Sequence, residues 1–276
     1  MLTNPNDKTL QTAYLSQIWI YPVKSLAGTR VPVAHAGCSG LQHDRQWMVT
    51  DAGGHALTQR DIPGMAPLRA SVTANGLEMA SIHEMGDKVI VPFSTRMGPQ
   101  MQVKVWNDRV YAHCPSQIAN QWLSERLGQE VKLVAMHPDI STRTYDVPRH
   151  PSGALSFADD FPYHLIGQSS VDDLNARLDE EVTIQRFRAN FVIAGLAPYG
   201  DDLLGTFTMG DAAFASISPC ERCVMVNIEP GSAKKGRQPL KTLSTYRRQG
   251  NNITFGQNLI AIREGIVREM DQILMH

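Results

Sequence analysis

Cysteine is scarce in this sequence, which limits how the chain can be held together. Only 4 of the 276 residues are Cys, and Cys38 and Cys114 lie far from each other and from the pair Cys220 and Cys223. So few cysteines in a chain of this length do not form the disulfide framework of small secreted domains. Hydrophobic residues make up 42% of the chain, enough for an ordinary core. We therefore expect free thiols and a reducing, cytoplasmic location.

Long apolar runs and a strong net charge are absent too. No stretch approaches the roughly 18 consecutive apolar residues of a membrane helix, and the polar segment 1–13 lacks a secretory signal. The formal net charge of −1 provides no overall field that would attract nucleic acid. The nucleotide-binding patterns GxGxxG and Walker A are missing. These absences argue against a membrane span, a nucleic-acid partner and nucleotide binding by those loops.

Short β-favouring segments separated by turn residues dominate the sequence. Asn75-Gly76 favours a hairpin between 68–73 and 77–81, because Gly accepts a positive φ. Further hairpins are expected around residues 51–54 and around Asn107-Asp108. Many short strands with turns between them are typical of a barrel or sandwich. Additional strands are expected at 17–21, 131–136, 187–194, 212–218, 224–228 and 259–264.

Two helices interrupt this pattern. One is expected to begin near Ser116 and to end at Gly128, and another to begin at Ser169 or Ser170. A segment rich in Pro, Ser and Arg, residues 138–153, is a candidate boundary. We thus predict a mostly β protein with a few helices (α+β), consisting of a tail at 1–14, a β-barrel-like domain at 15–137 and a second mostly β domain at 138–276.

Basic and hydroxyl side chains gather where the expected strands end. Lys24-Ser25 stands at a strand end before a glycine, and Arg45 leads directly into an apolar strand. Three more such residues are Arg60, Arg188 and Asn190. Each alone is most simply a solvated strand cap. Together they favour the binding of an anionic, multiply hydrogen-bonded ligand.

The segment Ser218-Pro219-Cys220-Glu221-Arg222-Cys223 carries the chemistry of soft metals or of redox reactions. A thiolate is the form that binds metals, and Arg222 is expected to lower the pKa of a neighbouring thiol. A single CxxC does not complete a four-ligand zinc site. An inert buried pair, a redox dithiol and a ligand of a metal cofactor all remain open on spacing alone.

These motifs resemble the MOSC family with its N-terminal β-barrel domain. Tyr21-Pro22-Val23-Lys24-Ser25-Leu26-Ala27-Gly28 is similar to the opening signature of that barrel, and Asp44-Arg45-Gln46-Trp47 resembles the Asp-Arg-x-Trp of the family. Arg188-Ala189-Asn190 resembles its Arg-Pro-Asn, and Cys220-Glu221-Arg222-Cys223 resembles its Cys-x-Arg-Cys. The order is kept over residues 15–265, and the pattern resembles that of mitochondrial amidoxime-reducing components and their bacterial relatives.

The resemblance implies a molybdenum cofactor, a molybdopterin carrying molybdenum, and the reduction of N-hydroxylated small molecules. By the same match Cys223 is the catalytic metal ligand. The residues implied to contact the pterin and its phosphate are Lys24, Ser25, Arg45, Arg188, Asn190, Glu221 and Arg222. The chain ends at His276 without the ferredoxin domain of some relatives. Electrons are therefore expected from a separate donor protein of ferredoxin, flavoprotein or cytochrome type.

Departures from the family pattern leave a second function open. The Thr-rich run and Asp-Pro that usually follow the second Cys are replaced by residues 225–230, Met-Val-Asn-Ile-Glu-Pro, so hydroxyl groups are lost beside the site. Asp159 and Asp160, in a loop that aligns with a cofactor-lining loop, are candidate proton donors beside bound water. The alternative is a cofactor-binding or sulfur-carrier protein that holds a persulfide on Cys220 or Cys223.

Overall fold

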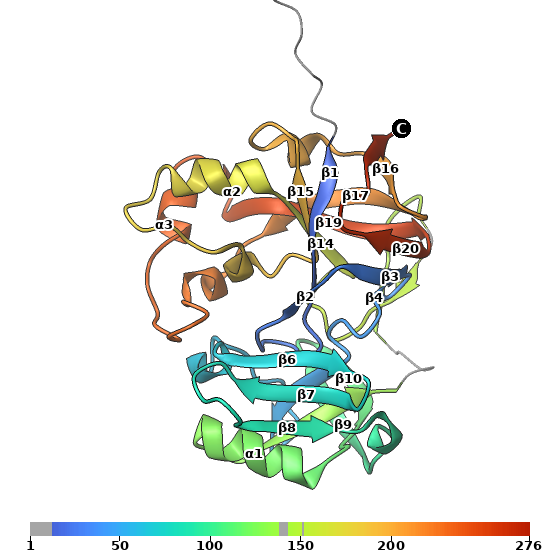
Figure 1. Ribbon diagram of the computed structural model, residues 1–276, viewed down its shortest axis with the longest axis vertical. Coiled ribbons are helices and arrows are strands. Elements are labelled where there is room, and N and C mark those ends of the chain that lie inside the picture. Colours follow the sequence, from blue (N-terminus) through green and yellow to red (C-terminus); the bar gives the residue numbers. More distant parts are fainter. Residues whose placement is uncertain (1–12, 138–142, 151) are drawn as a thin grey trace, which may run out of the picture.

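Strands account for most of the regular structure in a computed structural model that describes residues 13–137, 143–150 and 152–276. The chain forms two lobes (Figure 1). One contains strands β5–β11 and helix α1, and the other contains β1–β4 and the elements that follow β11. The predicted mostly β fold with few helices is confirmed.

The first lobe is built from hairpins. A sheet with the order β5-β11-β10-β9 lies beside a sheet with the order β6-β7-β8, and α1 packs near them. Its elements are β5 (Trp47–Asp51), β6 (Leu68–Thr73), β7 (Gly76–Ser81), β8 (Lys88–Val91), β9 (Gln100–Val105), β10 (Asp108–His113), α1 (Gln117–Leu127) and β11 (Val131–Met136).

Local sequence signals explain two of these elements. Gly76 has a φ of +136°, and a Cβ there would lie 2.2 Å from the Val91 carbonyl oxygen, so the hairpin turn requires glycine. Helix α1 begins where the Ser116 side chain accepts a hydrogen bond from the Ala119 N–H at 3.1 Å. It ends at Gly128 in the left-handed conformation, as predicted.

The second lobe is organised by a sheet of nine strands among the described residues. Its path is β2-β1-β15-β14-β19-β17-β16-β21, with β18 attached to β19. The strands are β1 (Tyr14–Ile20), β2 (Thr29–Val31), β14 (Tyr163–Gly167), β15 (Phe191–Ala194), β16 (Thr206–Met209), β17 (Ala212–Glu221), β18 (Arg248–Gln249), β19 (Asn252–Arg263) and β21 (Ile273–Met275).

Smaller elements complete this lobe. A sheet β20-β3-β4 and the pair β12-β13 accompany the large sheet, and α2 and α3 lie beside it (Figure 1). Their bounds are β3 (Val33–Gly37), β4 (Gly40–Leu41), β12 (Thr144–Tyr145), β13 (Gly153–Ala154), α2 (Gln168–Asn175), α3 (Leu240–Leu243) and β20 (Gly265–Arg268). Buried apolar residues from both ends of the chain share one core here, including Leu15, Phe191 and Phe214.

The sheet crosses the sequence boundary that was expected near residue 138. Strand β1 pairs antiparallel with β15, and β3 pairs with β20. The beginning of the chain is thus part of the second lobe before residues 47–136 form the first. A consequence for function is that Lys24, which follows β1, lies at the junction of the lobes.

Two predicted strands have a different structure. Residues 224–228 were expected to be a strand, but Val224–Asn227 is a 3-10 helix. The prediction for 187–194 holds only for Phe191–Ala194, because Ile184–Phe187 is a 3-10 helix and Arg188 is left-handed. In both places the apolar pattern is too short to distinguish a strand from a tight helical turn.

Candidate functional site

A polar cleft lies at the junction of the lobes and encloses about 890 Å³, counted to its open mouth. All the residues that the sequence assigned to the cofactor line it: Lys24, Ser25, Arg45, Arg188, Asn190, Glu221, Arg222 and Cys223. They come from the ends of several strands and from the turns beside them. Segments that are far apart in the sequence therefore meet around one space.

The backbone at three of these residues is in the left-handed region. The φ angles are 67° at Ser25, 48° at Arg45 and 55° at Arg188. Residues with a Cβ adopt this conformation at a cost of about 1–3 kcal/mol each, and such outliers concentrate at functional sites. These three residues lie near strand ends, and all three line the cleft.

The guanidinium groups of Arg45 and Arg188 lie close together over one ring. Each is 4.4 Å from the centre of the Tyr21 ring. Arg45 donates to the Arg188 carbonyl oxygen at 2.9 Å and pairs with the Asp44 carboxylate at 2.5 Å. Arg188 donates to the Leu26 carbonyl oxygen at 2.6 Å. Burial, and then the charge of Arg45, lower the pKa of Arg188 to about 10, so the pair is arranged to receive an anion.

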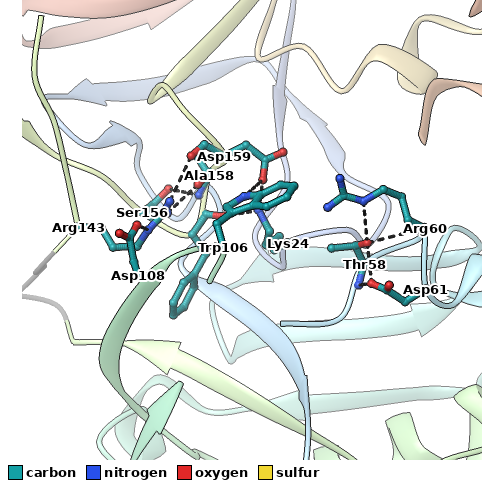
Figure 2. A network of polar contacts seen from close by, with 11 residues as sticks. Lys24, Thr58, Arg60, Asp61, Trp106, Asp108, Arg143, Ser156, Ala158 and Asp159 are labelled. Carbon is teal, nitrogen blue, oxygen red and sulfur yellow. Dashed lines mark hydrogen bonds and ion pairs between the residues drawn. The ribbon is translucent and has the colours of Figure 1, made fainter. Parts of the chain in front are cut away.

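Lys24 adds a buried ammonium group to this side of the cleft. It donates to the Phe157 carbonyl oxygen at 2.8 Å and forms a short ion pair with Asp159. Burial lowers the pKa of Lys24, although Asp159 partly offsets the effect. Trp106 also donates to Asp159, at 3.0 Å (Figure 2).

The two acids of the 157–164 loop differ in their ionisation. Burial opposes ionisation of Asp159, but the Lys24 ammonium and the hydrogen bonds from Lys24 and Trp106 outweigh it and hold the pKa of Asp159 well below its usual range. Burial, followed by the charges of Asp159 and Glu221, raises the pKa of Asp160. Of these two candidate proton donors, Asp160 is therefore the better one.

The two cysteines of the CxxC are not equivalent. Cys223 is exposed and immediately precedes the 3-10 helix Val224–Asn227. Cys220 is half-buried at the end of β17. Arg222 donates to the Cys220 sulfur at 3.0 Å, yet burial outweighs that guanidinium and raises the pKa of the Cys220 thiol. The expectation that Arg222 gives a neighbouring thiol a lowered pKa is therefore wrong for Cys220.

The terminal nitrogens of Arg222 have partners in the protein, whereas its Nε has none among the described residues. One terminal nitrogen donates to the Phe187 carbonyl oxygen at 2.8 Å, and the other lies 3.4 Å from Nε2 of His164. Its Nε is buried and has no hydrogen-bond partner within the described part of the chain. Burial and then the charge of Arg222 hold the pKa of His164 well below its usual value. An unpaired buried donor at a cleft suits a polar ligand.

Asn190 and Glu221 line the cleft with their polar groups already engaged. The Asn190 side chain accepts from the His164 N–H and donates to the Trp19 carbonyl oxygen, both at 3.2 Å, and so joins β14 to β1. Glu221 accepts from Asn252 at 2.5 Å on the exposed rim. In this arrangement Asn190 positions the strands that carry its neighbours.

The sequence indicated no role for several residues in or beside the cleft. Tyr21 belongs to the opening motif; it is not among the lining residues, but its ring contacts the guanidiniums of Arg45 and Arg188, which are. His164 lies on the buried strand β14, where an apolar pattern conceals it. Thr58 lies in a loop and accepts from the Arg60 Nε at 3.3 Å. The sequence has no repeating pattern that would identify these residues. Contacts between segments distant in the sequence bring them to the cleft.

Two family models cover almost the whole described chain. The MOSC N-terminal beta barrel domain matches residues 12–130, and the MOSC domain matches residues 96–274. The chain belongs to the MOSC domain family. This confirms the resemblance in the opening and Cys-x-Arg-Cys motifs.

Named relatives of two kinds match most of the chain. The Arabidopsis thaliana protein "Molybdenum cofactor sulfurase" is 33% identical over 91% of this chain, and the rice protein of that name is 30% identical over 93%. This chain spans about a third of their length, 33% in each case. The human "Mitochondrial amidoxime-reducing component 1" is 27% identical, and the match covers 96% of this chain and 83% of that protein.

Helices are short throughout the ranges that the structure describes, and none is long and apolar enough to cross a bilayer. Those ranges also contain no group of three or more His, Cys, Asp or Glu side chains arranged to hold a metal ion.

Proposed function

We propose that this protein is a molybdenum-cofactor-dependent oxidoreductase that reduces N-hydroxylated compounds of amidoxime or hydroxylamino-base type. The observation that carries the proposal is that one cleft combines the buried ammonium of Lys24 and the half-buried guanidiniums of Arg45 and Arg188 with the exposed thiol of Cys223. Cofactor relatives of both kinds and the MOSC family match support it.

The cleft suits an anionic pterin on physical grounds. The charge of Arg45 disfavours that of Arg188, and the nearby carboxylate of Asp44 pairs with Arg45, not with Arg188. A phosphate would relieve that repulsion through charge-assisted hydrogen bonds. Arg222 lines the cleft, and its Nε, a buried donor without a partner among the described residues, is the group that we assign to a pterin heteroatom. We assign the phosphate to Lys24, Ser25, Arg45 and Arg188, and the pterin to Arg222 with support from Glu221 and Asn190.

Cys223 is the residue we assign to the metal. A thiolate is a soft ligand suited to a metal that is also held by pterin sulfurs. When bound, the cofactor supplies the two-electron reduction of an N–O bond. The balanced reaction is R–NHOH + 2e⁻ + 2H⁺ → R–NH₂ + H₂O. Two electrons come from a separate donor protein, and Asp160 or water passes protons into the cleft.

The deciding experiment uses protein made in a host that produces the cofactor. Molybdenum and pterin are measured per chain, and an anaerobic assay with a reduced artificial donor follows turnover of N-hydroxylated amidines and bases. Sulfoxides and N-oxides serve as a second substrate panel. Turnover of the N-hydroxylated compounds that is lost in Cys223→Ala supports the proposal. A fully loaded and reducible protein that turns over none of them refutes it.

A sulfur-carrier role is the second candidate, favoured by the exposed thiol of Cys223 and by the sulfurase relatives. In this role Cys223 would hold a persulfide and give its outer sulfur to a nucleophilic acceptor, with the Cys223 thiolate as the leaving group. Persulfide detected on Cys223 without bound metal would favour it. Stoichiometric molybdenum and a stable pterin would favour the reductase.

A further inference from the structure

Trp106 occupies a position that local structure alone does not explain. It stands in the turn between β9 and β10 with a φ of 55°, and it is 49% exposed. A turn of this kind favours Gly or Asn, because a bulky side chain is strained at a positive φ. The turn therefore retains a large aromatic residue at a cost in both backbone strain and exposed apolar surface.

Two contacts hold the ring in place, and each partner is itself fixed by a further contact. The indole N–H donates to Asp159 at 3.0 Å, and Asp159 is paired with buried Lys24. On the ring, the Arg60 guanidinium lies 4.5 Å from the centre. Arg60 is itself oriented by its Nε, which donates to Thr58 at 3.3 Å (Figure 2). The ring is exposed but fixed, so little conformational entropy remains to be lost when a ligand stacks on it.

These contacts connect Trp106 to the cleft. Arg60, Thr58 and Asp159 all belong to its lining, together with Lys24. Arg60 lines the same cleft as the Cys223 thiol, and Trp106, which is not itself among the lining residues, adjoins that lining through its contacts with Arg60 and Asp159; we call Trp106 and Arg60 the aromatic rim. Guanidinium planes and indole rings both stack on flat conjugated groups.

We propose that the aromatic rim binds the planar part of the substrate and selects aromatic amidoximes and hydroxylamino bases over aliphatic ones. The inference rests on the proposed function, since it names the substrate class of the same cleft. A purely structural role is a weaker explanation, because Gly would form the turn without strain and Asp159 would still be paired with Lys24.

The test measures binding to the cofactor-loaded full chain in its oxidised form. Dissociation constants of benzamidoxime and acetamidoxime are determined by calorimetry, and their ratio is the aromatic preference. Stacking on an aromatic side chain is worth about a factor of ten or more in affinity. We expect Trp106→Ala to reduce the preference by about ten-fold, and Trp106→Phe to keep it within about three-fold.

Two further variants make the test specific. Trp106→Gly removes the ring but suits the positive φ, so the same loss is expected with the turn intact. Tyr111→Ala removes another exposed aromatic side chain of the same hairpin, on β10, and should leave the preference unchanged. An unchanged preference in both Trp106→Ala and Trp106→Gly overturns the inference.

Turnover of the same two compounds separates this inference from the proposed function. A Trp106-dependent preference in binding without any reduction of either compound upholds the aromatic rim and refutes the reductase. Reduction of both compounds with a preference that does not depend on Trp106 upholds the reductase and refutes the rim.

Discussion

The side chains of Lys24, Arg45 and Arg188, which we call the cation wall, are held by partners within the protein. The thiol segment, residues 220–223, by contrast has one exposed thiol and one buried donor without a partner among the described residues. Each cation of the wall donates to a backbone carbonyl oxygen or pairs with a carboxylate. In the thiol segment the Cys223 thiol is exposed and the Arg222 Nε has no partner within the described residues. Side chains that are fixed before binding suit a group that stays bound. An exposed thiol suits a metal ligand, and an unpaired donor suits a polar group at the site of reaction.

The largest expected effect lies in the thiol segment. Cys223→Ala should abolish reductase turnover, because the metal loses its protein ligand, while pterin binding partly survives on the cation wall. The free energy of unfolding should change by no more than about 0.5 kcal/mol, since the side chain is exposed. Anaerobic turnover, metal analysis and urea unfolding measure the three quantities.

Cys220→Ala is the matched control for that variant. Its thiol is half-buried and accepts from Arg222, so we expect a smaller loss of turnover. Equal losses in the two variants would contradict the difference between the cysteines and would support a dithiol mechanism.

The next effect concerns the cation wall. Arg188→Ala removes a charge-assisted hydrogen bond worth about 1.5–3 kcal/mol, which corresponds to about one to two powers of ten in cofactor affinity. Pterin content after dialysis measures it. Arg268→Ala serves as the control, because Arg268 forms an exposed pair with Asp211 at 3.7 Å. If Arg188→Ala mainly unfolds the protein while its folded fraction stays fully loaded, Arg188 is structural.

A smaller effect is expected on stability when Lys24 loses its partner. Asp159→Asn should lower the free energy of unfolding at pH 7 by about 1–2 kcal/mol, since Asp159 is half-exposed but Lys24 is buried. The pKa of Asp159 is lowered in the folded state. Its stabilisation is therefore complete above about pH 4 and is lost only as the pH falls well below the usual Asp range.

Urea unfolding at several pH values tests this dependence. The difference between wild type and Asp159→Asn should be constant from pH 5 to 7 and should shrink in strong acid. Asp211→Asn, in the exposed pair with Arg268, should show a much smaller difference. A difference that grows as the pH falls would show that the sign of the linkage is wrong.

The smallest expected effect comes from the N-cap of α1, a site outside the lining of the cleft. Ser116→Ala removes the N-cap of α1 and should cost about 1 kcal/mol of stability. Cofactor content and turnover should stay at the wild-type level at temperatures where the variant is folded. If both fall, general stability rather than the cation wall limits cofactor retention.

Much of the local structure follows from the sequence. Asn75-Gly76 predicts the β6–β7 hairpin, and Ser116 and Gly128 predict both ends of α1. These features depend on neighbouring residues, so short-range conformational preferences determine them. The wrong strand at 224–228 shows the limit of such signals, because a short and mostly apolar run also fits a 3-10 turn.

Motifs that carry a family resemblance also identified, from the sequence alone, eight of the residues that line the cleft, whereas others such as His164 and Thr58 were missed. Only the tertiary structure decided how each of them acts. It pairs β1 with β15, and it engages the Asn190 amide in hydrogen bonds to backbone groups. It raises the pKa of the Cys220 thiol by burial, although Arg222 lies beside it. It also placed Trp106 beside Arg60 and Asp159. The physical reason is that burial, charge and hydrogen bonding at the cleft arise from contacts between segments more than 40 residues apart in the chain, such as those of Trp106, and no local pattern encodes them.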